Sequence, residues 1–337
     1  MPLLAWSQDD LLAHRSGYHV LADYLDAPKV VTRRCDPSSP FPLFFTRMAR
    51  RLAASRWYSG GSWQMERQIV KHSRAGFDGP VHLLWCDRDL GFLDLFLQQP
   101  IIGTFHQCPD DLPHIIRRPS ALKKLAAIIL MSDSQRPYFL HHGVSPHRLH
   151  RIPHGVDVDH FTPLAFEPGE AFNVLAVGGT RRDFPLMQSV ANSLRDNPRF
   201  HFDIVGPPDK QALFAGMSNV RYHQGIDDAA LLDLYRRSSC LLHLPENATA
   251  NNVVLEALAC GLPVISQRIG GIPEYLTPEC ASVTAPGDGE AVVKALASLA
   301  ESQTRQMEMR EAARAHALKF DWRITARATA EIYRTAA

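Results

Sequence analysis

The chain has 337 residues, which is more than one ordinary hydrophobic core accommodates, so two domains are expected. Hydrophobic residues make up 45% and charged residues 21%, a balance typical of a folded soluble protein and unlike a disordered chain. The net charge of +1 argues against bulk nucleic-acid binding, because such proteins carry a basic surplus.

The cysteines and the start of the chain indicate a cytoplasmic protein. The six cysteines are scattered without a CxxC pair, so we expect reduced and mostly buried thiols. The first residues, MPLLAWSQDD, lack the basic and apolar regions of a signal peptide. No segment keeps the roughly 18 apolar residues that a membrane-spanning helix needs.

Short apolar runs alternate with helical patterns in the first half of the chain. A helix is expected from Tyr18 to Leu25. The alternation is typical of a parallel sheet covered by helices on both faces. The expected strands cover residues 2–6, 29–32, 81–86, 100–105, 126–132 and 148–153.

A basic and aromatic segment at residues 33–75 interrupts this alternation. One interpretation is an ordinary pair of amphipathic helices, basic outside and aromatic inside. The other is a peripheral contact with the inner, anionic membrane face or with an anionic lipid-linked acceptor. The basic residues are Arg33, Arg34, Arg47, Arg50, Arg51, Arg56, Arg67, Lys71 and Arg74, and the aromatic ones are Phe41, Phe44, Phe45, Trp57, Tyr58 and Trp63.

A second series of strands and helices follows a stretch rich in turn formers at 161–171, which is the expected linker. Helices are expected near 186–194, 228–237 and 253–260, and the last two over 289–318 and 321–333. The predicted fold class is therefore α/β, with two Rossmann-like doubly wound domains. The expected strands lie at 173–179, 201–206, 219–225, 240–245, 263–267 and 281–286.

The loop at 245–252 lies between a strand and a helix, where open α/β sheets bind their ligands. Asn251 or Asn252 can cap this helix, and Cys260-Gly261 ends it. The N–H groups at the helix start would favour a phosphate. Glu256 lies about one turn in, so its carboxylate either reaches the same pocket or only complements the helix dipole.

Three stretches carry a resemblance to a known family. The sequences IPHGVDVDHFTP at 152–163, NNVVLEALACGLPVIS followed by GGIPE at 251–274, and FDWRITARATAEIYR at 320–334 resemble the group 1 (family 4) retaining glycosyltransferases of the GT-B fold. The resemblance implies two domains facing across a cleft. The acceptor-side domain would cover 1–160, with the C-terminal helix 320–337 packing back on it, and the nucleotide-sugar domain would cover 172–318.

The family has a pair of glutamates in the loop and helix of the donor site. Glu256 matches the second, which binds the donor ribose, and the neighbouring Asn252 and Val253 would also bind the donor. The position of the first is Ala248, while Glu246 lies two residues upstream. Either a loop insertion lets Glu246 contact the transferred sugar, or Thr249 or water takes over that contact.

Other matches to the family lie at the ends of strands. In VLAVGGTRRDFPLM, the resemblance assigns close backbone approach to Gly179 and diphosphate binding to Arg182 in preference to Arg181, although the family's usual lysine is missing. His106 follows a strand where many members have a histidine that contacts the sugar. Gly17 stands where the family has a glycine-rich loop near the diphosphate.

The resemblance implies a retaining transfer from a UDP- or GDP-sugar to a hydroxyl acceptor, either lipid-linked or saccharide, without metal or cofactor. Asp87 and Asp89 offer a metal-binding alternative, but the order of elements favours a helix start. Two other functions stay open. One is a catalytically silent relative that binds sugar nucleotide or serves in assembly, and the other is a phosphorylase or epimerase on the same fold.

Overall fold

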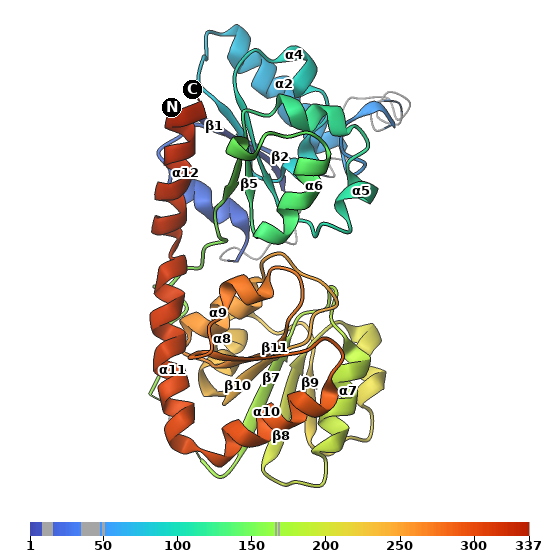
Figure 1. Cartoon of the computed structure of the whole chain (residues 1–337), viewed down its shortest axis with the longest axis vertical. Coiled ribbons are helices and arrows are strands. Elements are labelled where there is room, and N and C mark those ends of the chain that lie inside the picture. Colours follow the sequence, from blue (N-terminus) through green and yellow to red (C-terminus); the bar gives the residue numbers. More distant parts are fainter. Residues whose placement is uncertain (9–15, 35–47, 49–50, 166, 168, 337) are drawn as a thin grey trace. The chain divides into compact units, whose positions relative to one another are not determined.

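The computed structural model describes residues 1–8, 16–34, 48, 51–165, 167 and 169–336 (Figure 1). The chain divides into two compact units. Unit 1 comprises Met1–Gly155 and Trp322–Ala337, and unit 2 comprises Val156–Asp321. Phe41, Phe44, Phe45, Arg47 and Arg50 of the basic and aromatic segment lie outside the described residues.

Unit 1 is built on a six-stranded sheet in the order β2-β1-β3-β4-β5-β6, and every pairing is parallel. The chain reverses its direction of travel across the sheet between β1 and β3. The carboxyl ends of these strands are therefore the edge where a ligand is expected. The strands are β1 (Leu3–Gln8), β2 (Lys29–Arg33), β3 (Val81–Leu83), β4 (Ile101–Phe105), β5 (Ala127–Leu130) and β6 (Leu149–Arg151).

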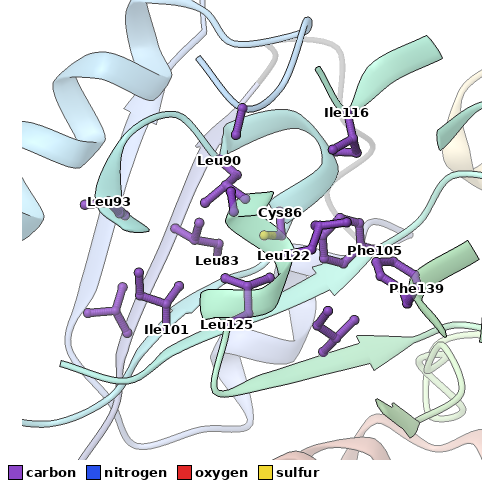
Figure 2. Close-up of a cluster of buried hydrophobic side chains, with 14 of the residues drawn as sticks. Leu83, Cys86, Leu90, Leu93, Ile101, Phe105, Ile116, Leu122, Leu125 and Phe139 are labelled. Atoms are coloured by element: carbon purple, nitrogen blue, oxygen red, sulfur yellow. The ribbon is translucent and has the colours of Figure 1, made fainter. Parts of the chain in front are cut away.

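Short helices connect these strands, and the longer α2 and α12 flank them (Figure 1). The helix expected at 18–25 is a 3-10 helix, η1, over Tyr18–Asp23. Figure 2 shows how Leu83, Cys86 and Phe105 form one buried apolar cluster with the neighbouring helices. The helices are η1, α2 (Gly60–Arg74), α3 (Cys86–Asp89), α4 (Leu93–Phe96), α5 (Leu112–Ile115), η2 (Pro119–Lys124), η3 (Asp133–Gln135), α6 (Arg136–His141), η4 (Pro146–Arg148) and α12 (Trp322–Ala336).

The last helix, α12, is part of unit 1 although it ends the chain. Tyr333 Oη lies 2.7 Å from His82 Nδ1, and His82 Nε2 lies 2.8 Å from Thr104 Oγ1. The ring of Trp322 is fully buried, and a Cβ atom on Gly155 would approach it to 2.3 Å. This close approach explains the glycine at that position. Among the described residues, no helix has both the length and the apolar character needed to cross a membrane.

Unit 2 contains a second parallel six-stranded sheet, in the order β12-β11-β10-β7-β8-β9. Its strands are β7 (Phe172–Val177), β8 (Phe200–Val205), β9 (Val220–His223), β10 (Cys240–His243), β11 (Val264–Gln267) and β12 (Ala281–Thr284). Apolar clusters lie on both faces, with Leu175 and Leu241 in one and Val174 and Leu242 in the other. The alternation along β7 and β10 is that of a sheet buried on both sides.

The helices of unit 2 are α7 (Phe184–Ser193), η5 (Pro208–Phe214), α8 (Asp228–Arg237), α9 (Asn252–Ala259), η6 (Ile272–Tyr275), α10 (Gly289–Glu301), α11 (Gln303–Ala317) and η7 (Leu318–Phe320). The single helix expected at 289–318 is wrong, because Ser302 interrupts it. The Ser302 side chain accepts a hydrogen bond of 3.2 Å from the N–H of Arg305 and so starts a new helix.

Two parallel sheets with helices on both faces confirm the predicted fold class. In unit 2 the chain reverses its direction of travel across the sheet between β7 and β10. The segments that follow these two strands therefore lie next to each other at the carboxyl edge, which is where doubly wound folds bind ligands.

Candidate functional site

The amino terminus of α9 is the centre of the candidate site in unit 2. The helix begins at Asn252, and Asn251 occupies the cap position without a capping hydrogen bond from its side chain. Its last residue is Ala259, and the C-cap Cys260 is followed by Gly261 in the left-handed region with φ of 68°. The helix therefore begins at the carboxyl edge of the sheet, with its positive dipole end there.

Glu256 lies one turn into α9 and is almost fully buried, with 4% of its surface exposed. The hydroxyl of Tyr235, on α8, donates a hydrogen bond of 2.9 Å to Glu256 Oε2. Burial and the nearby carboxylate raise the pKa of Tyr235 well above its usual value. The phenol therefore stays protonated and fixes the position of the carboxylate.

Arg182 follows β7 and brings positive charge to the same helix end. Its guanidinium donates to the carbonyls of Val177 at 3.2 Å and Thr180 at 3.1 Å. The contact from Nη2 to Asn251 Oδ1 is longer, at 3.4 Å. Burial lowers the pKa of Arg182, although an arginine keeps its charge at neutral pH. The cation is thus held by carbonyls next to the start of α9.

The turn that carries Arg182 contains two glycines, Gly178 and Gly179. Gly178 has φ of 102°, and a Cβ atom there would approach Arg182 Nη2 to 3.0 Å. Gly179 faces Pro207, whose ring carbons would lie 3.0 Å from a Cβ atom. Arg181 is exposed and also has a positive φ of 51°. Arg182 contacts the cap residue of α9.

The loop between β10 and α9 holds the two positions considered for the first glutamate. Glu246 is exposed, and its N–H donates to the carbonyl of Arg181 at 3.0 Å. Ala248 is 7% exposed and packs in an apolar cluster. Its carbonyl accepts from Gly271 N at 2.8 Å, and a Cβ atom on Gly270 would approach it to 2.0 Å. Position 248 is therefore a packing position, while Glu246 is an exposed carboxylate on the same loop.

The first two residues of α9 complete this part of the site. Asn252 and Val253 are partly exposed at the start of the helix. Val253 packs against the apolar cluster that also contains Ala248. Within unit 2, the structure thus brings together Arg182, Asn252 and Glu256 around one helix terminus, while Glu246 lies beside Arg181.

In unit 1, His106 follows β4 and is held in a defined orientation. Asp87 Oδ2 accepts hydrogen bonds from the N–H groups of His106 at 2.8 Å and Gln107 at 2.9 Å. His106 Nε2 lies 2.8 Å from the carbonyl of Leu84, so this nitrogen carries the proton. Burial, and to a lesser degree Arg88, lowers the pKa of His106 to about 4. The ring is neutral at physiological pH, and its Nδ1 is an acceptor.

Gly17 is followed by Tyr18, whose ring packs against His106. The rings of Tyr18 and His106 meet edge to face with centroids 4.8 Å apart. A Cβ atom on Gly17 would approach His19 Nδ1 to 2.4 Å, so a side chain there would displace His19. Gly17 precedes η1, and its carbonyl accepts from Val20 N at 3.1 Å. The Gly17 turn and His106 therefore form a second local group at the carboxyl edge of unit 1.

Asp87 and Asp89 lie in the short helix α3, as the helix-start interpretation expects. Asp89 accepts hydrogen bonds from Ser7 N at 2.9 Å and from Ser62 Oγ at 2.8 Å. Burial raises the pKa of Asp87 to about 6. Both carboxylates therefore tie strand ends and helices together inside unit 1.

Sequence reasoning missed Tyr235 and His243. Tyr235 lies on α8, in the expected helix at 228–237, where the apolar spacing predicts only a residue of the hydrophobic core. His243 ends β10, and Ser266 Oγ donates to its carbonyl at 2.7 Å. Since that uses the only Ser266 proton, His243 Nδ1 must donate to Ser266 Oγ at 3.1 Å. The signals for them are a Tyr on the helix that precedes β10 and a His inside the apolar run of β10 itself.

Comparison with known proteins gives a family match over the second half of the chain. A family model described as glycosyl transferase-like matches residues 181–331. This range contains Arg181, Arg182, Glu246 and Glu256. It also includes the start of α12, which belongs to unit 1.

Curated relatives share about a quarter to a third of the aligned residues. A D-inositol 3-phosphate glycosyltransferase of Kribbella flavida is 26% identical over 313 residues, which cover 79% of this chain and 71% of that protein. A sulfoquinovosyl transferase of Arabidopsis thaliana is 31% identical over 187 residues, or 50% of this chain and 36% of that protein. An MMP alpha-(1->4)-mannosyltransferase of Mycolicibacterium hassiacum is 29% identical over 212 residues, which cover 57% of this chain and 50% of that protein.

Solved structures resemble the whole chain. A glycosyltransferase of Rickettsia africae matches with a TM-score of 0.71 at 14% identity, covering 99% of this chain and 98% of that one. The Anabaena protein HepE, solved in complex with UDP and glucose, matches with a TM-score of 0.70 at 15% identity. The match covers 99% of this chain and 100% of that one. At these identities the likeness concerns the fold.

Proposed function

We propose that this chain, whose residues 181–331 match a glycosyl transferase-like family model, is a GT-B glycosyltransferase that moves a sugar from a nucleotide diphosphate to a hydroxyl acceptor with retention of anomeric configuration. The observation that carries the donor assignment is the contact between Arg182 and Asn251 at the start of α9. A fixed guanidinium and a helix amino terminus at one point form an environment for an anion with several oxygens.

We assign the diphosphate to this point. Arg182 is held by the carbonyls of Val177 and Thr180, so its cation needs little reorganisation when a phosphate arrives. The long contact to Asn251 Oδ1 is the one that a phosphate oxygen would replace. Gly179, Arg181, Asn252 and Val253 line the approach in this assignment. Charge that develops on the leaving diphosphate would be stabilised by groups already in place.

We assign the ribose to Glu256. Its carboxylate is fixed by Tyr235 and lies one turn behind the helix start that would bind phosphate. A carboxylate accepts hydrogen bonds from vicinal hydroxyl groups, which supports a ribonucleotide donor.

Each unit offers one candidate contact for the transferred sugar, Glu246 in unit 2 and His106 in unit 1. Glu246 is the exposed acidic side chain of the loop before α9, and Ala248 is packed in the core. His106 is neutral and carries its proton on Nε2, so Nδ1 can accept a hydrogen bond from a sugar hydroxyl. Gly17 is assigned to backbone approach near the donor.

In the proposed reaction, the acceptor oxygen attacks the anomeric carbon from the side of the leaving group. The bond from that carbon to the diphosphate oxygen breaks, and the bond to the acceptor oxygen forms. The proton of the acceptor hydroxyl passes to the departing phosphate oxygen. In this account Arg182 and α9 neutralise the diphosphate, so neither a metal ion nor a cofactor takes part.

The donor is proposed to be a UDP- or GDP-sugar, and the acceptor a saccharide or a lipid-linked hydroxyl compound in glycan or glycolipid synthesis. Support comes from the Anabaena structures in complex with UDP and UDP-glucose and from curated relatives named for transfer to inositol phosphate. Cys86, Cys108, Cys240, Cys260 and Cys280 are buried thiols that form no disulfide among the described residues, which fits the reducing cytoplasm.

The test is turnover with a panel of labelled UDP-, GDP- and ADP-sugars and a pool of saccharide and lipid acceptors. We expect release of the nucleoside diphosphate and a labelled product whose anomeric configuration, measured by NMR, equals that of the donor. An inverted product would contradict the retaining mechanism. Binding of a donor without turnover across the panel would instead support a catalytically silent relative. The observation that motivates this alternative is the buried Ala248 at the position of the family's first glutamate.

A further inference from the structure

A groove of about 830 Å³ runs between α2 and α4 of unit 1, away from His106. These two helices lie side by side in Figure 1. Because α2 leads into β3 and α4 into β4, Arg74 and Phe96 lie near the amino ends of the strands. His106 follows the carboxyl end of β4. The groove is therefore separate from the site assigned to the reaction.

One wall of the groove is a basic stripe along α2. Arg67, Lys71 and Arg74 follow one another at helical spacing of three or four residues and are all exposed. Within the described part of the chain, neither Lys71 nor Arg74 takes part in an ion pair. Lys71 and Arg74 therefore present positive charge that no ion pair among the described residues offsets to whatever fills the groove.

The acidic residue of the groove does not offset this charge. Glu66 is buried, and it accepts hydrogen bonds from Tyr58 Oη at 2.7 Å and from the N–H groups of Gly91 and Phe92 at 2.9 Å. Burial raises the pKa of Glu66 to about 7, so its carboxyl is partly neutral at physiological pH. Its bonds point inward, and the exposed wall stays cationic.

The opposite wall is apolar and exposed. Phe96 on α4 is 70% exposed and lines the groove, and the adjacent Leu95 is 51% exposed. Trp63 and Phe92, whose rings are 6.2 Å apart, lie further along the same groove. Phe96 and Leu95 therefore place exposed apolar carbon beside the cations of α2.

We propose that this groove docks unit 1 on an anionic phospholipid bilayer. Arg67, Lys71 and Arg74 would contact headgroup phosphates, while Phe96 and Leu95 would enter the boundary between headgroups and acyl chains. The charge complementarity favours an anionic bilayer over a neutral one. Exposed aliphatic and aromatic carbons favour it over a soluble polyanion, which offers nothing to cover them. The docking does not depend on the sugar transfer.

The test is flotation of the full chain with phosphatidylcholine vesicles with and without phosphatidylglycerol. Wild type should float with the anionic vesicles, and high salt should release it. Lys71→Gln/Arg74→Gln should bind about 25-fold more weakly, because each cation near an anionic surface contributes about a fivefold change. Phe96→Ser should also bind more weakly. Wild type that stays soluble with anionic vesicles would overturn the proposal.

A matched control separates this surface from net charge. Arg195→Gln/Lys294→Gln removes two exposed cations of unit 2 and should float like wild type. If it loses as much binding as Lys71→Gln/Arg74→Gln, the groove is not the docking surface. If the wild type is a dimer in solution and Phe96→Ser makes it a monomer, the proposal is overturned, because the groove would then bind a second copy of the chain. Thermal shifts with nucleotides should be unchanged in all these variants, so failure of docking and failure of the donor assignment are distinguishable.

Discussion

The hydroxyl of Tyr235 donates a hydrogen bond of 2.9 Å to Glu256, which joins α8 to α9 beneath the helix start assigned to the donor. Both side chains are buried. A buried carboxylate with a fixed donor keeps one rotamer, so a ligand does not have to order it. We therefore treat Tyr235 as a positioning residue for Glu256.

Tyr235→Phe should weaken binding of UDP or GDP. The substitution removes only the hydroxyl, and hydrogen bonds to charged groups contribute about 1.5–3 kcal/mol. Since Tyr235 acts through the ribose contact, binding of a 2′,3′-dideoxynucleoside diphosphate should be affected much less than binding of the parent nucleotide. Calorimetric titration of both ligands measures this. Equal losses for both would mean that Tyr235 supports only the fold.

Glu256→Gln and Glu246→Gln should each lower turnover by about a hundredfold, the size expected when a site loses one preorganised polar contact. Initial rates with the best donor of the panel measure the effect. Glu279→Gln, at an exposed position of unit 2, is the matched control and should keep full activity. A Glu246→Gln variant as active as wild type would remove Glu246 from the sugar site and leave the contact to Thr249 or water.

Chelation should leave turnover unchanged. In the proposed mechanism, Arg182 and the start of α9 supply the positive charge that a metal ion would otherwise provide. Activity is measured before and after dialysis against EDTA. Loss of activity that magnesium or manganese restores would contradict this account and would call for carboxylate ligands.

His106 should make stability depend on pH below neutrality. Its folded pKa of about 4 is lower than the ordinary value of 6.5, so the neutral ring's contribution is complete above pH 6.5. This contribution is lost as the pH falls toward 4, because the unfolded chain binds the proton first. The advantage of wild type over His106→Gln in unfolding free energy should shrink by about 1.4 kcal/mol per pH unit in that window. Urea unfolding at several pH values measures it, and a constant difference would contradict the burial of this ring.

The sequence predicts the local features of the fold well, because they follow from periodicity. Apolar runs locate the strands of both sheets, and the start and end of α9 follow from Asn251, Cys260 and Gly261. The break at Ser302 was missed, because apolar spacing continues through it and only the cap bond to Arg305 interrupts the helix. The 3-10 form of η1 was missed for a similar reason, since apolar spacing over so few residues does not distinguish it from an α-helix.

Contacts between distant segments are the part that the sequence does not reveal. Ala248 is a packing position because Gly270 and Gly271 turn back onto its carbonyl, more than twenty residues later in the chain. Glu256 has a partner on another helix, and His106 is oriented by Asp87 from the preceding strand end. None of these pairings has a spacing that marks it in advance.

Arg182 offers the most direct test of the donor site. Calorimetric titration with UDP, GDP and uridine compares wild type with Arg182→Gln and Arg181→Gln. We predict that wild type binds one of the diphosphates far more tightly than uridine, and that Arg182→Gln loses about a hundredfold in affinity for it while Arg181→Gln loses much less. If wild type binds neither diphosphate, or if Arg182→Gln binds it as tightly as wild type, the assignment of the diphosphate to Arg182 and the start of α9 is contradicted.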